Sequence, residues 1–295
     1  MKPGGWRGAR PLPMAQAITL PTAPTRRSTQ AVPAPASAAL DPCGVDLYAD
    51  DVNGNPDTPA YAASGSPWTF LGLKATEGTY YNGAAWFTKQ WGAARASSRY
   101  GVDFLRLAYA YLRADYNAIA QADYFLEFMD TNGWDPAGDI VPVADFESAE
   151  QPAGVTAQQV IDVLSAYAER IKAVLGCAPM RYTGSLFRDL GIVEPCGCPF
   201  LWVADYGPEL NPAEYTDQGY TLANTWAWQY RGTSPQAAGP KGYPMTAPIG
   251  PGGAEAEADI NVIIINGGGN PAAQLAWTKA NLLIPAQQAA RLRAR

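Results

Sequence analysis

The feature that most constrains the fold of this chain is the alternation of short apolar segments with helical patterns along its body. Eight segments are typical of strands: residues 44–48, 70–75, 104–112, 140–146, 180–183, 200–206, 226–230 and 260–265. Helices are expected at 84–99, 118–131 and 156–175, and none is expected between the last three strands. Such alternation favours a parallel sheet, and eight strands over roughly 225 residues fit a closed barrel. We therefore predict an α/β fold built as an irregular TIM-like barrel.

The two ends of the chain differ in composition from its body. Residues 1–40 hold seven prolines, nine alanines and five basic residues but no acid, which predicts a disordered basic leader. We expect the barrel at 41–266 and a helix with a basic tail at 267–295. The formal net charge is −6, so the body between these basic ends is strongly acidic. An acidic body is a poor partner for nucleic acid, whose binding depends on phosphate contacts, and it suits a polysaccharide better.

The absence of histidine excludes several classes of chemistry. Without an imidazole the chain can build neither a Ser-His-Asp nor a Cys-His nucleophile system. Zinc sites that depend on histidine are excluded as well. A general acid or base must then be a carboxylate, Lys, Tyr or Cys. No apolar run is long enough for a transmembrane segment.

The four cysteines, Cys43, Cys177, Cys196 and Cys198, carry little information. Their spacing is poor for a zinc ribbon, so we expect no metal and no other cofactor. A disulfide from Cys177 to Cys196 or Cys198 would be possible in an oxidising compartment. Buried free thiols are an equally good interpretation.

Acidic residues stand at the ends of expected strands, where a parallel barrel has its active site. Asp46 ends the first strand, Asp145 and Glu147 end the fourth, and Asp259 opens the last. Asp145 and Glu147 share one side of their strand, with backbones about 6.6 Å apart, because side chains alternate. Like charges this close raise at least one pKa, which suits a general acid in glycosidic bond cleavage. This separation leaves retention and inversion open, and many Asp-x-Glu triplets are only surface pairs or helix caps.

Seven segments, taken in order, resemble family 25 of the glycoside hydrolases, the Chalaropsis-type lysozymes or N-acetylmuramidases. The segments are GVD at 44–46, FLGLKATEGTYY at 70–81, PVADFE at 142–147, RYTG at 181–184, LWVADYG at 201–207, WAWQY at 226–230 and DIN at 259–261. The resemblance implies a flattened barrel of about five strand–helix units plus three further strands. It also implies hydrolysis of the β-1,4 bond between N-acetylmuramic acid and N-acetylglucosamine in peptidoglycan.

Site residues follow from the resemblance position by position. Glu147 is similar to the general acid of the family, and Asp145 to the partner that acts on the N-acetyl group of the substrate or stabilises charge. Asp46 and Asp259 resemble the flanking acids of the cleft. The expected sugar contacts are all aromatic: Tyr109, Tyr182, Trp202, Tyr206 and Trp228. Lys74 and Glu77 are expected to form a structural ion pair.

The chain departs from the family pattern at two places. Ala110 stands where the family often has histidine, which puts substrate positioning in doubt. After the first strand the chain has Tyr48-Ala49-Asp50-Asp51, and these extra acids could change the charge of the cleft or its substrate. Two alternatives therefore remain: a non-catalytic barrel that binds cell-wall glycan, and a hydrolase of another amino-sugar polymer such as chitin.

The expected place of action is the cell wall or periplasm, because peptidoglycan is the expected partner. No recognisable signal peptide begins the sequence, since no apolar stretch follows the early basic residues. Export by a holin or a secretion machine would account for this, and we expect a monomer.

Overall fold

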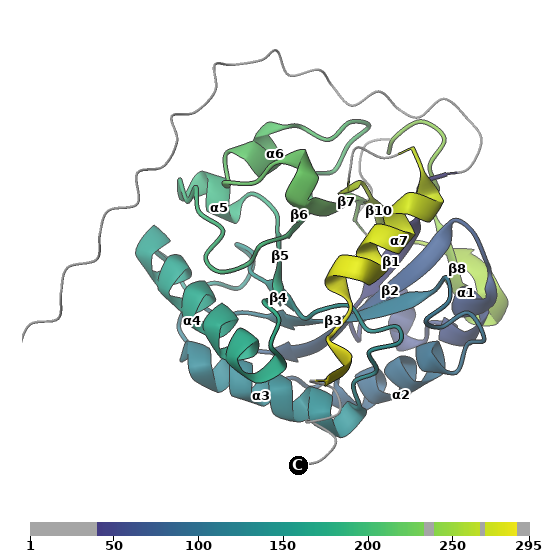
Figure 1. Cartoon of the computed structure of the whole chain (residues 1–295), viewed down its shortest axis with the longest axis horizontal. Helices are drawn as coiled ribbons and strands as arrows, with labels where there is room; N and C mark the ends of the chain where they lie inside the picture. The colour runs from purple at the N-terminus through teal and green to yellow at the C-terminus, as the bar shows by residue number, and fades with distance from the viewer. Residues whose placement is uncertain (1–39, 233–238, 266–268, 288–295) are drawn as a thin grey trace, which may run out of the picture. The chain divides into compact units, whose positions relative to one another are not determined.

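The computed structural model describes residues 40–232, 239–265 and 269–287, and within them eight strands close into a barrel (Figure 1). The barrel strands are β1 (Cys43–Leu47), β2 (Trp68–Glu77), β3 (Leu105–Tyr111), β4 (Val143–Asp145), β5 (Met180–Thr183), β6 (Leu201–Ala204), β7 (Thr225–Arg231) and β10 (Asp259–Ile263). Their order around the barrel is β1-β10-β7-β6-β5-β4-β3-β2. The eight strand segments and the α/β barrel predicted from the sequence are confirmed.

The α-helices of the described residues are α1 (Thr58–Ala63), α2 (Ala84–Arg95), α3 (Ala118–Asn132), α4 (Ala157–Leu175), α5 (Leu186–Asp189), α6 (Ala213–Thr216) and α7 (Pro271–Leu282). Short 3₁₀ turns lie at Asp51–Gly54, Leu222–Asn224 and Pro251–Gly253, and β8 (Ala247–Gly250) pairs with β9 (Ala254–Ala256) in a separate hairpin. The expected helices at 84–99, 118–131 and 156–175 correspond to α2, α3 and α4. The expectation of no helix between the last three strands is wrong at one place, because the four-residue α6 lies between β6 and β7. Residues 1–39 of the expected leader at 1–40 lie outside the described residues, and so do the last residues, 288–295.

Helix α4 shows how local sequence sets an element. The Thr156 side chain accepts a hydrogen bond from the Gln159 backbone, and the Gln159 side chain accepts one from the Thr156 backbone N–H. This reciprocal capping box satisfies backbone donors that a helix start leaves free. The helix ends at Gly176, whose φ of 69° is the left-handed conformation that glycine adopts at no steric cost.

Strand β10 is the exception to the parallel arrangement expected from the sequence. It runs antiparallel to both β1 and β7, whereas the other neighbouring pairs are parallel. No crossover helix lies between β7 and β10 in the described residues; the chain passes through the β8–β9 hairpin instead. The reversal has a functional consequence, because the first residue of β10, Asp259, pairs with Asp46 near the end of β1.

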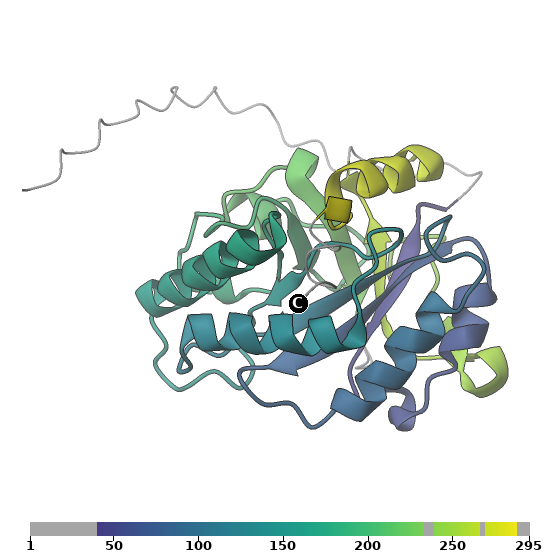
Figure 2. The same ribbon diagram turned by 60° about the horizontal axis from the view of Figure 1, so that its bottom comes forward.

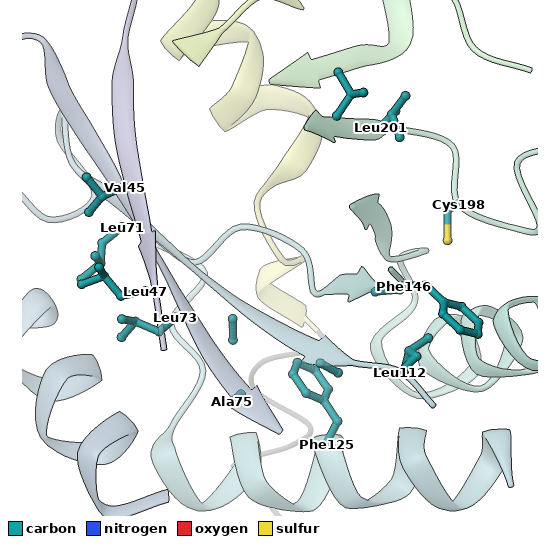
Figure 3. Close-up of a cluster of buried hydrophobic side chains, with 14 of the residues drawn as sticks. Val45, Leu47, Leu71, Leu73, Ala75, Leu112, Phe125, Phe146, Cys198 and Leu201 are labelled. Atoms are coloured by element: carbon teal, nitrogen blue, oxygen red, sulfur yellow. The ribbon is translucent and has the colours of Figure 1, made fainter. Parts of the chain in front are cut away.

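Two layers of apolar side chains hold the barrel together. Outward-facing residues such as Leu71 and Leu73 pack in the layer between strands and helices, which Figure 3 shows in part. Phe70 and other inward-facing residues fill the barrel interior. Gly44 is required beside Phe70, because a Cβ at position 44 would lie 2.5 Å from the ring.

Helix α7 covers the barrel end at which the parallel strands begin. The indole N–H of Trp226 donates to Thr278 at 3.1 Å, Gln274 donates to the Ile263 carbonyl at 2.6 Å, and the Val141 N–H donates to the Leu282 carbonyl at 2.7 Å. Figure 2 shows α7 beside the strands, with α2 and α3 on their outer face. The opposite end, where the parallel strands finish, is therefore the end left for a site.

A buried ion pair ties β3 to the chain segment before β4. The Arg106 guanidinium is fully buried and donates to Asp139 at 2.5 and 3.1 Å. It also donates to the Trp91 carbonyl and lies 3.7 Å from the centroid of the Trp91 ring. Because both charges are out of water, each depends on the other for its stability.

Candidate active site

The four carboxylates predicted from the sequence meet at the end of the barrel where the parallel strands finish. Asp46 lies in β1, Asp145 ends β4, Glu147 follows two residues later, and Asp259 opens the reversed strand β10. The charges of Asp259 and Asp145 both act on Asp46, and the charge of Asp259 acts on Glu147. The fold thus brings together acids that are separated by up to 213 positions in the sequence.

Glu147 has the properties of a general acid for neutral pH. Burial, and then the charge of Asp259, raises the pKa of Glu147 from 4.5 to about 7, against the opposing charge of Lys74. Its side chain lines a polar cavity of about 290 Å³. The other lining residues are Ser148, Gly184, Ser185, Arg188, Ala204, Asp205, Tyr206 and Glu214. A carboxyl that stays protonated near pH 7 beside such a cavity can donate a proton to a bound ligand.

Asp145 lies deeper than Glu147 and is only 4% exposed. Burial, and then the charge of Glu147, raises the pKa of Asp145 well above its usual range. Its Oδ1 has no hydrogen-bond partner in the part of the chain that the structure describes. The two neighbouring carboxyls therefore cannot both ionise without a large electrostatic cost.

Asp46 is held by two amide side chains. Asn261 donates to Asp46 Oδ1 at 2.7 Å and Gln229 donates to the same oxygen at 3.3 Å. Burial and the charge of Asp259 raise the pKa of Asp46, whereas the hydrogen bond from Asn261 opposes this rise. Gln229 and Asn261 were not singled out in the sequence, although they belong to the WAWQY and DIN segments.

The aromatic residues expected to contact sugar occupy different positions. Tyr206 is 42% exposed and lines the cavity beside Glu147. Tyr109 and Tyr182 lie in the barrel interior, where their hydroxyls donate to the Leu47 carbonyl and to Gln229. Trp202 is 1% exposed, and Trp228 packs in the layer between strands and helices. The Trp202 and Trp228 indole N–H groups donate to Asn261 and to the Asp205 carbonyl. Contact of these two side chains with sugar stays a prediction from the sequence.

The ion pair expected between Lys74 and Glu77 is confirmed, with Lys74 Nζ 2.7 Å from Glu77 Oε2. Lys74 also lies 4.5 Å from the centroid of the Tyr111 ring. Its positive charge lowers the pKa values of both Asp145 and Glu147. The charge of Lys74 therefore limits how far burial raises the pKa values of these two carboxyls.

The two departures from the family pattern differ in their relation to the site. Ala110 is buried in the layer between strands and helices, so its side chain faces away from the barrel interior. Asp51 accepts a hydrogen bond from the Tyr48 N–H at 2.8 Å, and burial raises its pKa to about 7. The charge of Asp259 adds to this rise, so Asp51 belongs electrostatically to the carboxylate group.

The four cysteines, Cys43, Cys177, Cys196 and Cys198, are free thiols, so the alternative of a disulfide is not realised. Across residues 40–232, 239–265 and 269–287, no group of three or more Cys, Asp or Glu side chains is arranged to hold a metal ion. No helix in these same ranges has the length and hydropathy needed to cross a membrane.

Two muramidases are similar in sequence to part of this chain. The chain is 32% identical over 158 residues to an N,O-diacetylmuramidase of Arthroderma benhamiae, covering 52% of this chain and 63% of that protein. It is 34% identical over 119 residues to an N,O-diacetylmuramidase of Chalaropsis, covering 39% of this chain and 54% of that protein. The chain thus spans less than two thirds of the length of these relatives.

Solved structures show the same fold. A family 25 lysozyme from Aspergillus fumigatus superposes with a TM-score of 0.58 at 20% identity, covering 82% of this chain and 99% of that one. A family 25 glycosyl hydrolase from Bacillus anthracis superposes with a TM-score of 0.58 at 20% identity, covering 80% of this chain and 93% of that one. The sequence model of glycosyl hydrolases family 25 matches residues 46–238, which is more than half of the chain. The chain therefore belongs to family 25 of the glycosyl hydrolases.

Proposed function

We propose that the protein is a lysozyme-type glycoside hydrolase, an N-acetylmuramidase. It would cleave the β-1,4 bond between N-acetylmuramic acid and N-acetylglucosamine in peptidoglycan. The observation that carries the proposal is Glu147, a carboxyl with a pKa raised to about 7 that lines a polar cavity at the end of the barrel. The names of the two muramidase relatives support peptidoglycan as the substrate.

The proposed reaction uses Glu147 as its general acid. Glu147 gives its proton to the glycosidic oxygen as the bond from that oxygen to the anomeric carbon breaks, and the bonding electrons leave with the oxygen. Asp145 stabilises the cationic sugar, directly or through the N-acetyl group of the substrate. Water then bonds to the anomeric carbon, and the proton it releases returns to Glu147. Asp46 and Asp259 set the charge around the reacting sugar.

The proposed setting follows from the substrate. Peptidoglycan lies in the cell wall, so we propose that the protein acts there. One chain carries all four carboxylates, so we expect it to act as a monomer. Export by a holin or a secretion machine remains a prediction from the sequence.

Product analysis tests the proposed bond and substrate. The wild-type protein is incubated with purified peptidoglycan and, separately, with chitin oligomers, and the soluble products are identified by mass spectrometry. New muramic-acid reducing ends from peptidoglycan alone are expected. Products from chitin alone would assign the protein to another amino-sugar polymer. Binding to peptidoglycan without any product would identify a glycan-binding barrel instead.

A further inference from the structure

The most exposed aromatic side chains are concentrated at the carboxylate end of the barrel. In the described residues, four tyrosines are exposed by more than two fifths: Tyr48 at 41%, Tyr80 at 76%, Tyr116 at 46% and Tyr206 at 42%. Each follows the end of a parallel strand, namely β1, β2, β3 and β6. Exposed Val102 and Val193, in contrast, lie in segments that lead into strands β3 and β6 at the other end.

Three of these tyrosines stand on loops that contact one another. The Ala49 N–H, next to Tyr48, donates to the hydroxyl of Tyr81, next to Tyr80, at 3.1 Å. The Tyr116 ring packs against Gly78, where a Cβ would lie 3.1 Å from the ring. Strands β1, β2 and β3 are neighbours in the barrel, so their loops form a continuous edge.

We propose that Tyr48, Tyr80 and Tyr116, the tyrosine row, form a binding site for the glycan strand beyond the sugars being cleaved. An exposed aromatic ring offers an apolar face to the C–H groups of a sugar and a hydroxyl to its polar groups. The row is continuous with the loops around the carboxylates, so a long glycan is the occupant that reaches both. The inference rests on the proposed function for the identity of the glycan, peptidoglycan.

Cosedimentation with insoluble peptidoglycan tests the row without requiring cleavage. Tyr80→Ala and Tyr116→Ala should each weaken binding about threefold to tenfold, whereas Val102→Ala and Val193→Ala should bind like wild type. On short muropeptide fragments, the tyrosine variants should keep the wild-type kcat/KM. If both tyrosine variants bound insoluble peptidoglycan as tightly as wild type, the proposal that the tyrosine row binds glycan would be wrong. If wild type cleaved no peptidoglycan but still bound it more tightly than the tyrosine variants, only the proposed reaction would be refuted.

Discussion

Replacing Glu147 with glutamine should stabilise the fold at high pH while it abolishes lysis. The pKa of Glu147 is raised from 4.5 to about 7 in the folded protein, chiefly by burial. Ionising this carboxyl therefore costs the folded state up to about 3 kcal/mol relative to the unfolded chain. Glutamine keeps the shape of the side chain but removes the ionisation, so the variant avoids this cost.

The sign of the effect fixes its pH window. Below about pH 4.5 the carboxyl is protonated in both states and contributes no difference. As the pH rises from there through about 7, the unfolded chain releases the proton first, and wild type loses stability. The free energy of unfolding of Glu147→Gln minus that of wild type should therefore increase over this window and level off above it.

Urea denaturation followed by tryptophan fluorescence, repeated from about pH 4 to about pH 8, measures this difference. Glu127→Gln, at an exposed position on α3, controls for the loss of a surface carboxylate. A difference between Glu147→Gln and wild type that is constant across the range would refute the burial argument. A variant that is less stable than wild type at pH 8 would refute it as well.

Three further predictions concern activity and stability. The wild-type kcat/KM for peptidoglycan should fall as the pH rises through about 7, because Glu147 must be protonated to act as the acid; a pH–rate profile checks this. Asp46→Asn should reduce the rate of peptidoglycan lysis less than Glu147→Gln does when the two variants are measured side by side. An equal or greater reduction by Asp46→Asn would reverse the two assigned roles. Asp139→Asn should lower the free energy of unfolding by about 3–5 kcal/mol in urea denaturation, because it leaves the buried Arg106 charge uncompensated.

The barrel could be predicted from the sequence because each strand is an apolar run with local boundaries. The direction of β10 could not be predicted from the sequence, because it depends on the connection from β7 and not on the residues of the strand itself. Helix α1 was missed because its six residues are too few to show a helical period. The hairpin β8–β9 was also missed, since its short strands flank the turn Pro251–Gly253.

The carboxylates were easier to predict than the groups around them. Asp145 and Glu147 stand out because acids at the end of an apolar strand are unusual. An aromatic residue such as Trp202 gives no such signal, since both the barrel interior and the helix layer accept large rings. The sequence gives no signal at Gln229 and Asn261 either, because their importance comes from hydrogen bonds to Asp46. Asp46 is 183 positions from Gln229 and 215 positions from Asn261.

The most direct test of Glu147 as the acid of a muramidase compares two rates on one substrate. Wild type and Glu147→Gln, both verified as folded by circular dichroism, are incubated with purified peptidoglycan, and new muramic-acid reducing ends are counted over time. The proposed mechanism predicts steady release by wild type and none above background by the variant. Near-normal release by Glu147→Gln would contradict it and remove Glu147 from the catalytic role.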